Sequence, residues 1–204
     1  MRSIVAGALA LCAAAAPAAT ILVYGDSLSA GYGLQPGQEW ASLLAQRLQT
    51  EKWDYKVANA SISGETTHGG AKRIEAALVA HRPAIVIVEL GANDGLRGSA
   101  LETTRTNLEA IIDACRRAKA HVVLVGMRLP PNYGTPYAEK FHQNYREIAK
   151  RGKLALVPFL FEGFADKPEY FLSDGFHPAA NAQPLMLDTV WKDLRPLLKK
   201  PVMK

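Results

Sequence analysis

The chain has 204 residues, of which 49% are hydrophobic and 21% are charged. This composition suits one globular domain with a sizeable core and excludes an intrinsically disordered chain. The formal net charge of +5 is mild, and the basic residues are spread along the sequence without interleaved aromatic residues, which argues against binding to nucleic acid.

The first residues have the pattern of a secretory leader. Arg2 gives a basic start, an apolar Ala-rich run follows, and residues 16–18 form a small-x-small cleavage site. We expect cleavage after Ala18 or one residue later, so that residues 1–18 are a signal peptide and residues 19–204 form one domain. An uncleaved anchor is the weaker alternative, because the apolar run is shorter than the about 20 residues of a membrane span. The sequence therefore predicts an exported protein, periplasmic or secreted, without a stable membrane anchor.

Cysteine usage predicts a domain without an internal disulfide. Cys12 lies in the leader, so Cys115 is the one thiol of the exported chain. Cys115 shares a helical spacing with Ile111 and Ile112, which favours buried packing over nucleophilic chemistry.

Apolar runs alternate with helical patterns along the rest of the chain. Short apolar runs predict strands at 21–24, 55–59, 84–90, 122–125 and 154–157. Apolar residues at helical spacing predict helices near 40–48, 71–81, 101–119, 137–151 and 185–198. This alternation predicts an α/β fold, a three-layer flavodoxin-like sandwich with a central parallel sheet of about five strands in the order 2-1-3-4-5 and helices on both faces.

Polar and glycine-rich loops follow the first three predicted strands. They contain Ser27, Gly64 and Asn93, respectively. Ligands of such sheets bind beyond the carboxyl ends of the strands, where parallel strands bring their following loops together. The fold would therefore gather these three residues at one edge of the sheet.

Ser27 is the candidate nucleophile of an acyl-transfer site. It follows Gly25 and Asp26 at the expected start of a helix, where free backbone N–H groups favour negative charge on oxygen. The alternative is that Asp26 or Ser27 only caps the helix.

His177 is the candidate general base, because it lies in a loop with Asp174 three residues earlier and Pro178 after it. One short segment would thus supply both the base and the carboxylate that orients it. The alternative for Asp174 is a turn or cap. Surface positions are predicted for the other histidines, namely His68, His81, His121 and His142.

Three groups are candidates for binding an oxyanion. The side-chain amide of Asn93 can donate to a tetrahedral oxyanion, the backbone N–H of Gly64 can approach it closely, and the N–H of Ser27 completes the set. The alternative for residues 93–95 is a tight turn. No role follows from the sequence for Glu89, which ends the third predicted strand.

These residues together resemble the SGNH (GDSL) hydrolase family. The matching strings are Gly25-Asp26-Ser27-Leu28, Gly64 within 59–66, Gly91-Ala92-Asn93-Asp94 and Asp174-Gly175-Phe176-His177-Pro178. The longer strings at 25–32, 88–98 and 128–134 are similar to the thioesterase I, lysophospholipase and arylesterase group. The resemblance implies a serine esterase that hydrolyses acyl esters and thioesters, with Ser27, His177 and Asp174 as triad and no metal or other cofactor.

The resemblance also implies that the loop at 128–134 lines or gates a groove for the acyl chain of a small-molecule ester or lipid-derived substrate. Its candidate binding residues are Leu129, Pro130, Pro131, Asn132 and Tyr133. Two other functions remain as alternatives: a carbohydrate O-acetylesterase on the same fold, and a binding module that holds an anion without catalysis. The apolar loop suits a hydrocarbon chain better than a sugar.

Overall fold

The structure is a computed structural model that describes residues 18–199. The predicted signal peptide, apart from Ala18, lies outside the described residues. Within residues 18–199, no helix is both long enough and apolar enough to cross a membrane.

A five-stranded parallel sheet forms the centre of the molecule. Its strands are β1 (Ala19–Gly25), β2 (Tyr55–Asn59), β3 (Ile85–Glu89), β4 (His121–Val125) and β5 (Ala155–Val157). They are ordered β2-β1-β3-β4-β5, which confirms the predicted order. Strands β1 and β3 lie side by side, and their Ile and Val side chains are almost fully buried, as expected for strands covered on both faces.

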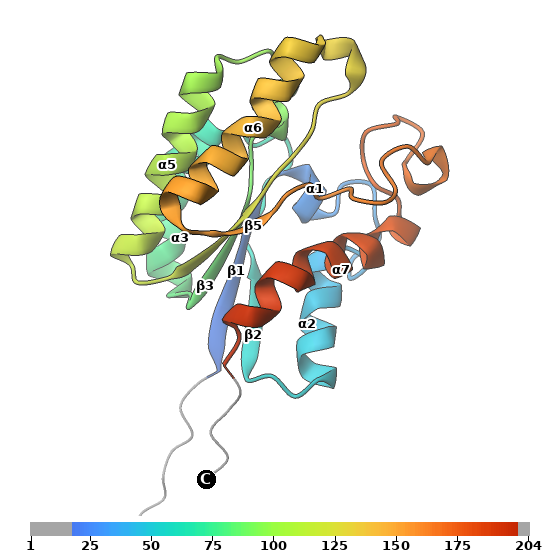
Figure 1. Cartoon of the computed structure of the whole chain (residues 1–204). Coiled ribbons are helices and arrows are strands. Elements are labelled where there is room, and N and C mark those ends of the chain that lie inside the picture. The colour runs from blue at the N-terminus through green and yellow to red at the C-terminus, as the bar shows by residue number, and fades with distance from the viewer. Residues whose placement is uncertain (1–17, 200–204) are drawn as a thin grey trace, which may run out of the picture.

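Helices cover both faces of the sheet and complete the three layers (Figure 1). One face carries α3 (Thr67–His81), α5 (Leu101–Arg117) and α6 (Thr135–Gly152). The other face carries α2 (Trp40–Thr50) and α7 (Gln183–Leu194). Cys115 of α5 is fully buried, as predicted, and burial raises the pKa of its thiol to about 12.

The helix boundaries differ from the predicted ones where capping residues decide them. Helix α3 begins at Thr67 rather than at residue 71, because the Thr66 hydroxyl accepts a hydrogen bond from the N–H of Gly69. Helix α7 ends at Leu194 and continues as a 3₁₀ turn at Arg195–Leu197.

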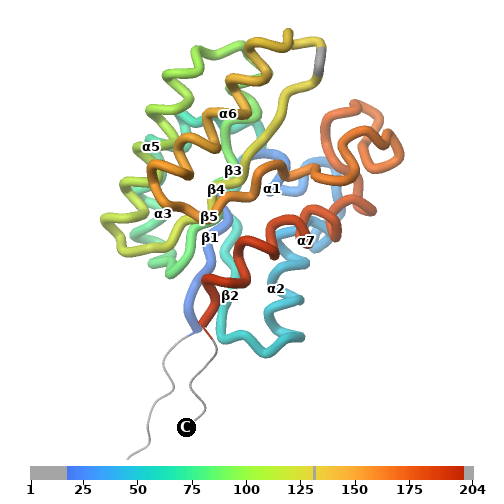
Figure 2. Tube along the Cα trace, in the orientation of Figure 1, coloured from blue at the N-terminus to red at the C-terminus, as the bar shows by residue number. Residues whose placement is uncertain are grey.

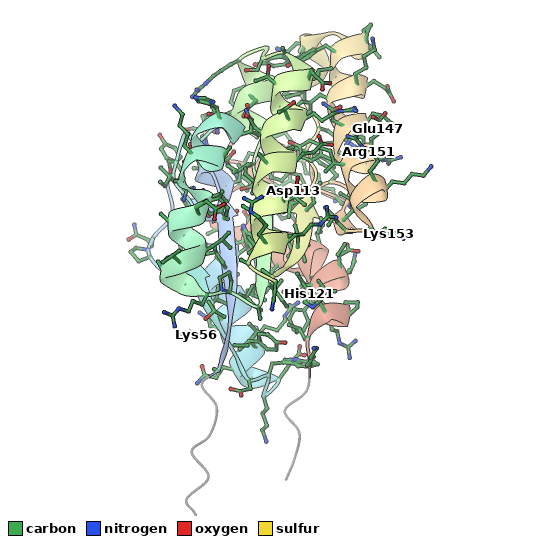
Figure 3. All side chains as sticks on the ribbon, turned by 90° about the vertical axis from the view of Figure 1, so that its left-hand side faces the viewer. Lys56, Asp113, His121, Glu147, Arg151 and Lys153 are labelled. Atoms are coloured by element: carbon green, nitrogen blue, oxygen red, sulfur yellow. The ribbon has the colours of Figure 1, made fainter. Side chains whose placement is uncertain are left out.

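Charged side chains cover the outer surface of α5 and α6, among them Asp113 of α5 and Glu147 and Arg151 of α6, which Figure 3 labels. Arg105 of α5 pairs with Glu147, and Arg151 pairs with Glu109. Pairs near the surface contribute about 0–1 kcal/mol each, so the stability of the fold comes mainly from its buried core.

The loops at the carboxyl ends of the strands contain two short helices, α1 (Ser27–Ala30) and α4 (Ala92–Leu96). A 3₁₀ turn at Pro131–Tyr133 precedes α6, and further 3₁₀ turns lie at Pro168–Tyr170 and Ala180–Ala182. The long segment between β5 and α7 folds back at this edge toward α1 (Figure 2). The candidate site is built here.

Candidate active site

Ser27 is the first residue of α1, and Asp26 alone separates it from the buried strand β1. Asp26 caps this helix, because its Oδ1 accepts the N–H of Leu28 at 3.0 Å. Gly31 ends the helix in a left-handed conformation, with φ of 80°, which glycine adopts without strain. Capping is therefore the role of Asp26, and the Ser27 hydroxyl is left to interact with other groups.

The hydroxyl of Ser27 lies at one end of a line of polar groups. Its Oγ is 3.0 Å from Nε2 of His177, and Nδ1 of the same ring is 2.7 Å from Oδ2 of Asp174. Asp174 Oδ1 also accepts the backbone N–H groups of His177 and Phe176, at 3.0 and 2.9 Å. The N–H of His177, followed by that of Phe176 and the His177 ring, lowers the pKa of Asp174 to about 2.

Hydrogen bonds on both sides of His177 fix the loop that contains it. Phe171 and Pro178 form an antiparallel bridge, and the N–H of Leu172 donates to the carbonyl of His177 at 2.8 Å. The side chain of Gln183 at the start of α7 donates to the carbonyl of Pro178 at 3.2 Å. The backbone thus fixes the direction in which the imidazole points.

Tyr32 covers one face of the His177 ring, with ring centroids 4.4 Å apart and an interplanar angle of 36°. The tyrosine is half exposed, so it separates the imidazole from bulk water on that side. Ring stacking of this kind restricts rotation of the imidazole while leaving both nitrogens available.

The three candidate oxyanion donors differ in the hydrogen bonds that they form. Among the described residues, the N–H groups of Ser27 and Gly64 have no hydrogen-bond acceptor. Gly64 has a φ of 80°, which only glycine adopts easily, and its Cα faces open space. The amide of Asn93 in α4 donates to Asp26 Oδ2 at 3.1 Å and to the carbonyl of Glu65 at 3.0 Å. The Asn93 amide is therefore held in position by two acceptors.

A cavity of about 580 Å³ opens beside Ser27, Asn93 and His177. Of the predicted loop residues, Leu129, Pro130 and Tyr133 line it. Asn132 is exposed and does not line the cavity, and Pro131 lies in the 3₁₀ turn. Gly64 and Asp174 lie outside the lining, Asp174 behind the imidazole and Gly64 beside Arg97, which donates to its carbonyl.

Most of the remaining cavity wall comes from residues for which the sequence predicted no role in substrate binding. The apolar ones are Leu28, Ala92, Leu96, Met127, Phe159, Phe161, Ala165, Phe171 and Phe176. Phe159 and Phe161 directly follow β5, at the same edge of the sheet as Ser27 and Asn93. The rule that ligands bind beyond the carboxyl ends of parallel strands could have identified them, had it been applied to the last strand as well.

In the described part of the chain, none of the other histidines hydrogen-bonds to Ser27 or Asp174. His68 and His121 are exposed, whereas His81 and His142 are half-buried. His142 differs from its predicted surface position because its Nδ1 lies 3.2 Å from the carbonyl of Met127, next to the cavity loop. Burial lowers the pKa of His142, so a neutral ring is favoured there.

The described residues contain no cluster of three or more His, Cys, Asp or Glu side chains arranged to hold a metal ion. The groups gathered at the cavity are a hydroxyl, an imidazole, a carboxylate and N–H donors, which is the set that acyl transfer requires.

Comparisons with known proteins agree with this geometry. Residues 23–183 match the GDSL-like lipase/acylhydrolase family, and the chain belongs to this family. It is 48% identical to esterase TesA of Pseudomonas aeruginosa, covering 94% of this chain and 95% of that protein. It is 43% identical to thioesterase 1/protease 1/lysophospholipase L1 of Escherichia coli K12, covering 90% and 87%.

A solved structure shows the same architecture. The psychrotrophic esterase EstA from Pseudoalteromonas sp., inhibited by monoethylphosphonate, superposes with a TM-score of 0.83 at 38% identity, covering 87% of this chain and 97% of that one. The chain is accordingly a carboxylic ester hydrolase with the fold of the SGNH hydrolases.

Proposed function

We propose that Ser27 is the nucleophile of this esterase and forms an acyl-enzyme during turnover. The hydrogen bond from Ser27 Oγ to His177 Nε2, continued by that from His177 Nδ1 to Asp174, is the observation that carries the proposal. Nε2 takes the proton as Oγ attacks the acyl carbonyl, and it then gives this proton to the leaving alkoxide or thiolate. A water molecule attacks the acyl-enzyme by the same steps in reverse and releases the acid.

Asp174 keeps the imidazole in the tautomer that this sequence of steps needs. Its carboxylate accepts the Nδ1–H, so the lone pair of Nε2 points at the serine. Because two backbone N–H groups also bind this carboxylate, it stays ionised well into the acidic range. The negative charge then stabilises the imidazolium that forms in each transition state.

The oxyanion of the tetrahedral intermediate is bound by the N–H groups of Ser27 and Gly64 and by the amide of Asn93. The two backbone donors are supported by their lack of other acceptors among the described residues. For Asn93, donation to the oxyanion exchanges its bond with the Glu65 carbonyl and keeps its bond with Asp26. A preorganised donor of this kind is worth about 2.7–4 kcal/mol in the transition state.

The substrates that fit this cavity are acyl esters and thioesters with a hydrocarbon chain. Its wall is mainly aromatic and aliphatic. The charged side chain of Arg128 also lines the cavity and lies over the ring of Phe159, with its guanidinium carbon 4.9 Å from the ring centroid. The names of the two relatives, an esterase and a thioesterase/lysophospholipase, support this class. Loop residues Leu129, Pro130 and Tyr133 contribute one side of the acyl site.

Export is part of the same proposal. The basic, apolar and small-x-small segments of residues 1–18 support cleavage near Ala18 and a periplasmic or secreted enzyme. Mass measurement of the protein recovered from the periplasm and the medium of a bacterial host tests it. A full-length chain retained with the membrane would overturn it.

Initial rates on p-nitrophenyl esters from acetyl to palmitoyl, for the wild type and Ser27→Ala, test the proposed activity. We expect the wild type to hydrolyse them with a maximum at medium or long chains, and the variant to be inactive. A maximum confined to acetyl would favour a carbohydrate O-acetylesterase. Equal rates for both proteins would remove Ser27 as the nucleophile.

A further inference from the structure

Two buried carboxyl groups lie directly behind Ser27. Asp26 precedes the serine, and Glu89 ends β3 as the register partner of Gly25, so the two meet across neighbouring strands. Both side chains are fully buried. Neither forms an ion pair with Lys, Arg or His within residues 18–199. Two adjacent carboxylates cannot both be ionised in such a setting, so one of them holds a proton.

The hydrogen bonds indicate which carboxyl is charged. Asp26 accepts two N–H donors, from the backbone of Leu28 at 3.0 Å and from the amide of Asn93 at 3.1 Å. Such donors stabilise the ionised form. Glu89 Oε2 accepts the hydroxyl of Ser29 at 2.8 Å and the N–H of Asp26 at 3.4 Å, whereas its Oε1 is buried without a partner in the described structure. A lone buried oxygen is tolerated far better on a neutral acid than on a carboxylate.

Burial and neighbouring charges also favour a proton on Glu89 rather than on Asp26. Burial raises the pKa of Asp26 to about 7, although the N–H of Leu28 and the amide of Asn93 lower it. Burial, and then the charge of Asp26, raise the pKa of Glu89 well above its usual range. The backbone N–H of Asp26 donates to Glu89 Oε2, so the two carboxyl groups are neighbours and two negative charges there would repel each other strongly. When one of the two carboxyl groups ionises, the charge therefore belongs on Asp26 and the proton stays on Glu89.

We propose that Glu89 is a positioning residue, a neutral carboxylic acid that holds the Asp26 carboxylate and, through it, the Ser27 helix and the Asn93 amide in the geometry for catalysis. This inference rests on the proposed roles of Ser27 and Asn93. It also gives a reason for Gly25, since a Cβ there would come within 2.7 Å of Glu89 Oε2 and 2.8 Å of Ser29 Oγ. Any residue larger than glycine at position 25 would therefore push against Glu89 and Ser29.

Other titratable groups face the pair from the elements packed around it. Asp94 of α4 raises the pKa of Asp26, and a protonated His177 lowers it. Tyr145 of α6 lies close enough for the charges of both carboxyls to affect it, and its hydroxyl donates to the carbonyl of Leu90. No group that would neutralise Glu89 by an ion pair is among them, so loss of its proton would place a second negative charge in the same buried site.

Glu89→Gln is the direct test, because an amide keeps the shape and the neutrality of the acid. Its oxygen can accept the bonds from the Ser29 hydroxyl and the Asp26 backbone N–H. We expect kcat within a few-fold of the wild type at neutral pH. On the alkaline side, kcat of the wild type should fall as Glu89 loses its proton, and kcat of Glu89→Gln should not show this fall. A folded Glu89→Gln protein with kcat lowered about a hundredfold would overturn the proposal, since the ionised form would then be required.

Glu89→Leu removes the polar contacts and keeps the volume. We expect kcat to fall about tenfold or more with KM nearly unchanged, because Glu89 does not line the cavity. The matched control is Val88→Ala, which makes a cavity in the same strand and should lower the melting temperature without this loss of kcat. Unchanged kcat in a folded Glu89→Leu protein would overturn the proposal.

Infrared spectroscopy tests the protonation state without relying on activity or on the folding of Glu89→Leu. At slightly alkaline pH, the wild type should show the carbonyl stretch of a buried protonated carboxylic acid, and Glu89→Gln should lack it. Absence of this band from the wild type would overturn the proposal. A Ser27→Ala variant as active as the wild type, with the band present, would instead mean that the proposed catalytic role of Ser27 is wrong.

Discussion

Replacing Asp174 by asparagine separates the electrostatic role of this residue from its structural one. Oδ1 of Asp174 accepts the N–H groups of Phe176 and His177, and an amide oxygen can accept both of them. The turn should therefore keep its shape. Where Oδ2 now accepts from Nδ1 at 2.7 Å, the variant would present an NH₂ donor. The imidazole would have to accept there, which moves its proton to Nε2, opposite the Ser27 hydroxyl, and removes the general base.

The expected loss of kcat depends on how exposed the side chains of Asp174 and His177 are. The same substitution in a buried Ser-His-Asp triad lowers kcat about 10⁴-fold. The side chain of Asp174 is 38% exposed and that of His177 25%, so water can compete with the wrong hydrogen bond. We expect a smaller loss, about 10³-fold in kcat, or roughly 4 kcal/mol of transition-state stabilisation.

The assay is the steady-state rate on a p-nitrophenyl ester of medium chain length, together with the melting temperature. Asp166→Asn, an exposed substitution in the same C-terminal segment, serves as the control and should change neither value. If Asp174→Asn kept kcat within about tenfold of the wild type, the carboxylate would not be setting the tautomer, and that part of the mechanism would be wrong.

Four further changes test other parts of the site. Asn93→Ala should lower kcat on an activated ester about 10²–10³-fold, and wild-type kcat would exclude Asn93 as an oxyanion donor. Gly64→Ala should lower the free energy of unfolding by about 1–2 kcal/mol, measured by urea denaturation, because alanine is strained at a φ of 80°; an unchanged midpoint would contradict this. Phe164→Ala should lower the free energy of unfolding by about 3–5 kcal/mol, since this fully buried ring packs against the segment that holds the His177 loop, and a loss below about 1 kcal/mol would show that it does not anchor that segment. Folding raises the pKa of Asp26 from 3.8 to about 7, so the native state binds more protons than the unfolded state and the free energy of unfolding falls as pH rises across this window. Asp26→Asn should flatten this dependence of the free energy of unfolding on pH. Equal slopes for the wild type and the variant would show that Asp26 is not protonated there.

The order of the sheet was predictable because its pattern is local. Each strand is a short apolar run and each helix an amphipathic repeat, and parallel strands joined by helices have few topologies. Predictions failed at the ends of helices, where single side chains decide. Nothing in the apolar periodicity of α3 marks its start at Thr67, which depends on the hydroxyl of Thr66.

The polar centre of the site was predictable because its residues have unusual chemistry for their positions. Ser27, Asn93 and His177 each stand in a loop after a strand or near a turn, and the structure brings all three to one cavity. The apolar wall was less predictable. By residue type, Phe159 and Phe161 cannot be told from core residues, and only their position just after the last strand could have marked them as cavity residues.

The role of Glu89 was hidden for a different reason. A carboxyl at the end of a buried strand has no local partner in the sequence, because its neighbours Asp26 and Ser29 lie about sixty residues earlier. Only the register between β1 and β3 brings them together. Long-range polar contacts of this kind depend on the completed sheet.

Covalent labelling tests the central claim, that Ser27 is the nucleophile, most directly. The protein is treated with a fluorophosphonate, and the adduct is measured by intact mass and located by peptide mapping. We predict one phosphonyl group on Ser27 of the wild type, no label on Ser27→Ala and much slower labelling of His177→Ala. Labelling of a different residue, or equal labelling of the wild type and Ser27→Ala, would contradict the mechanism.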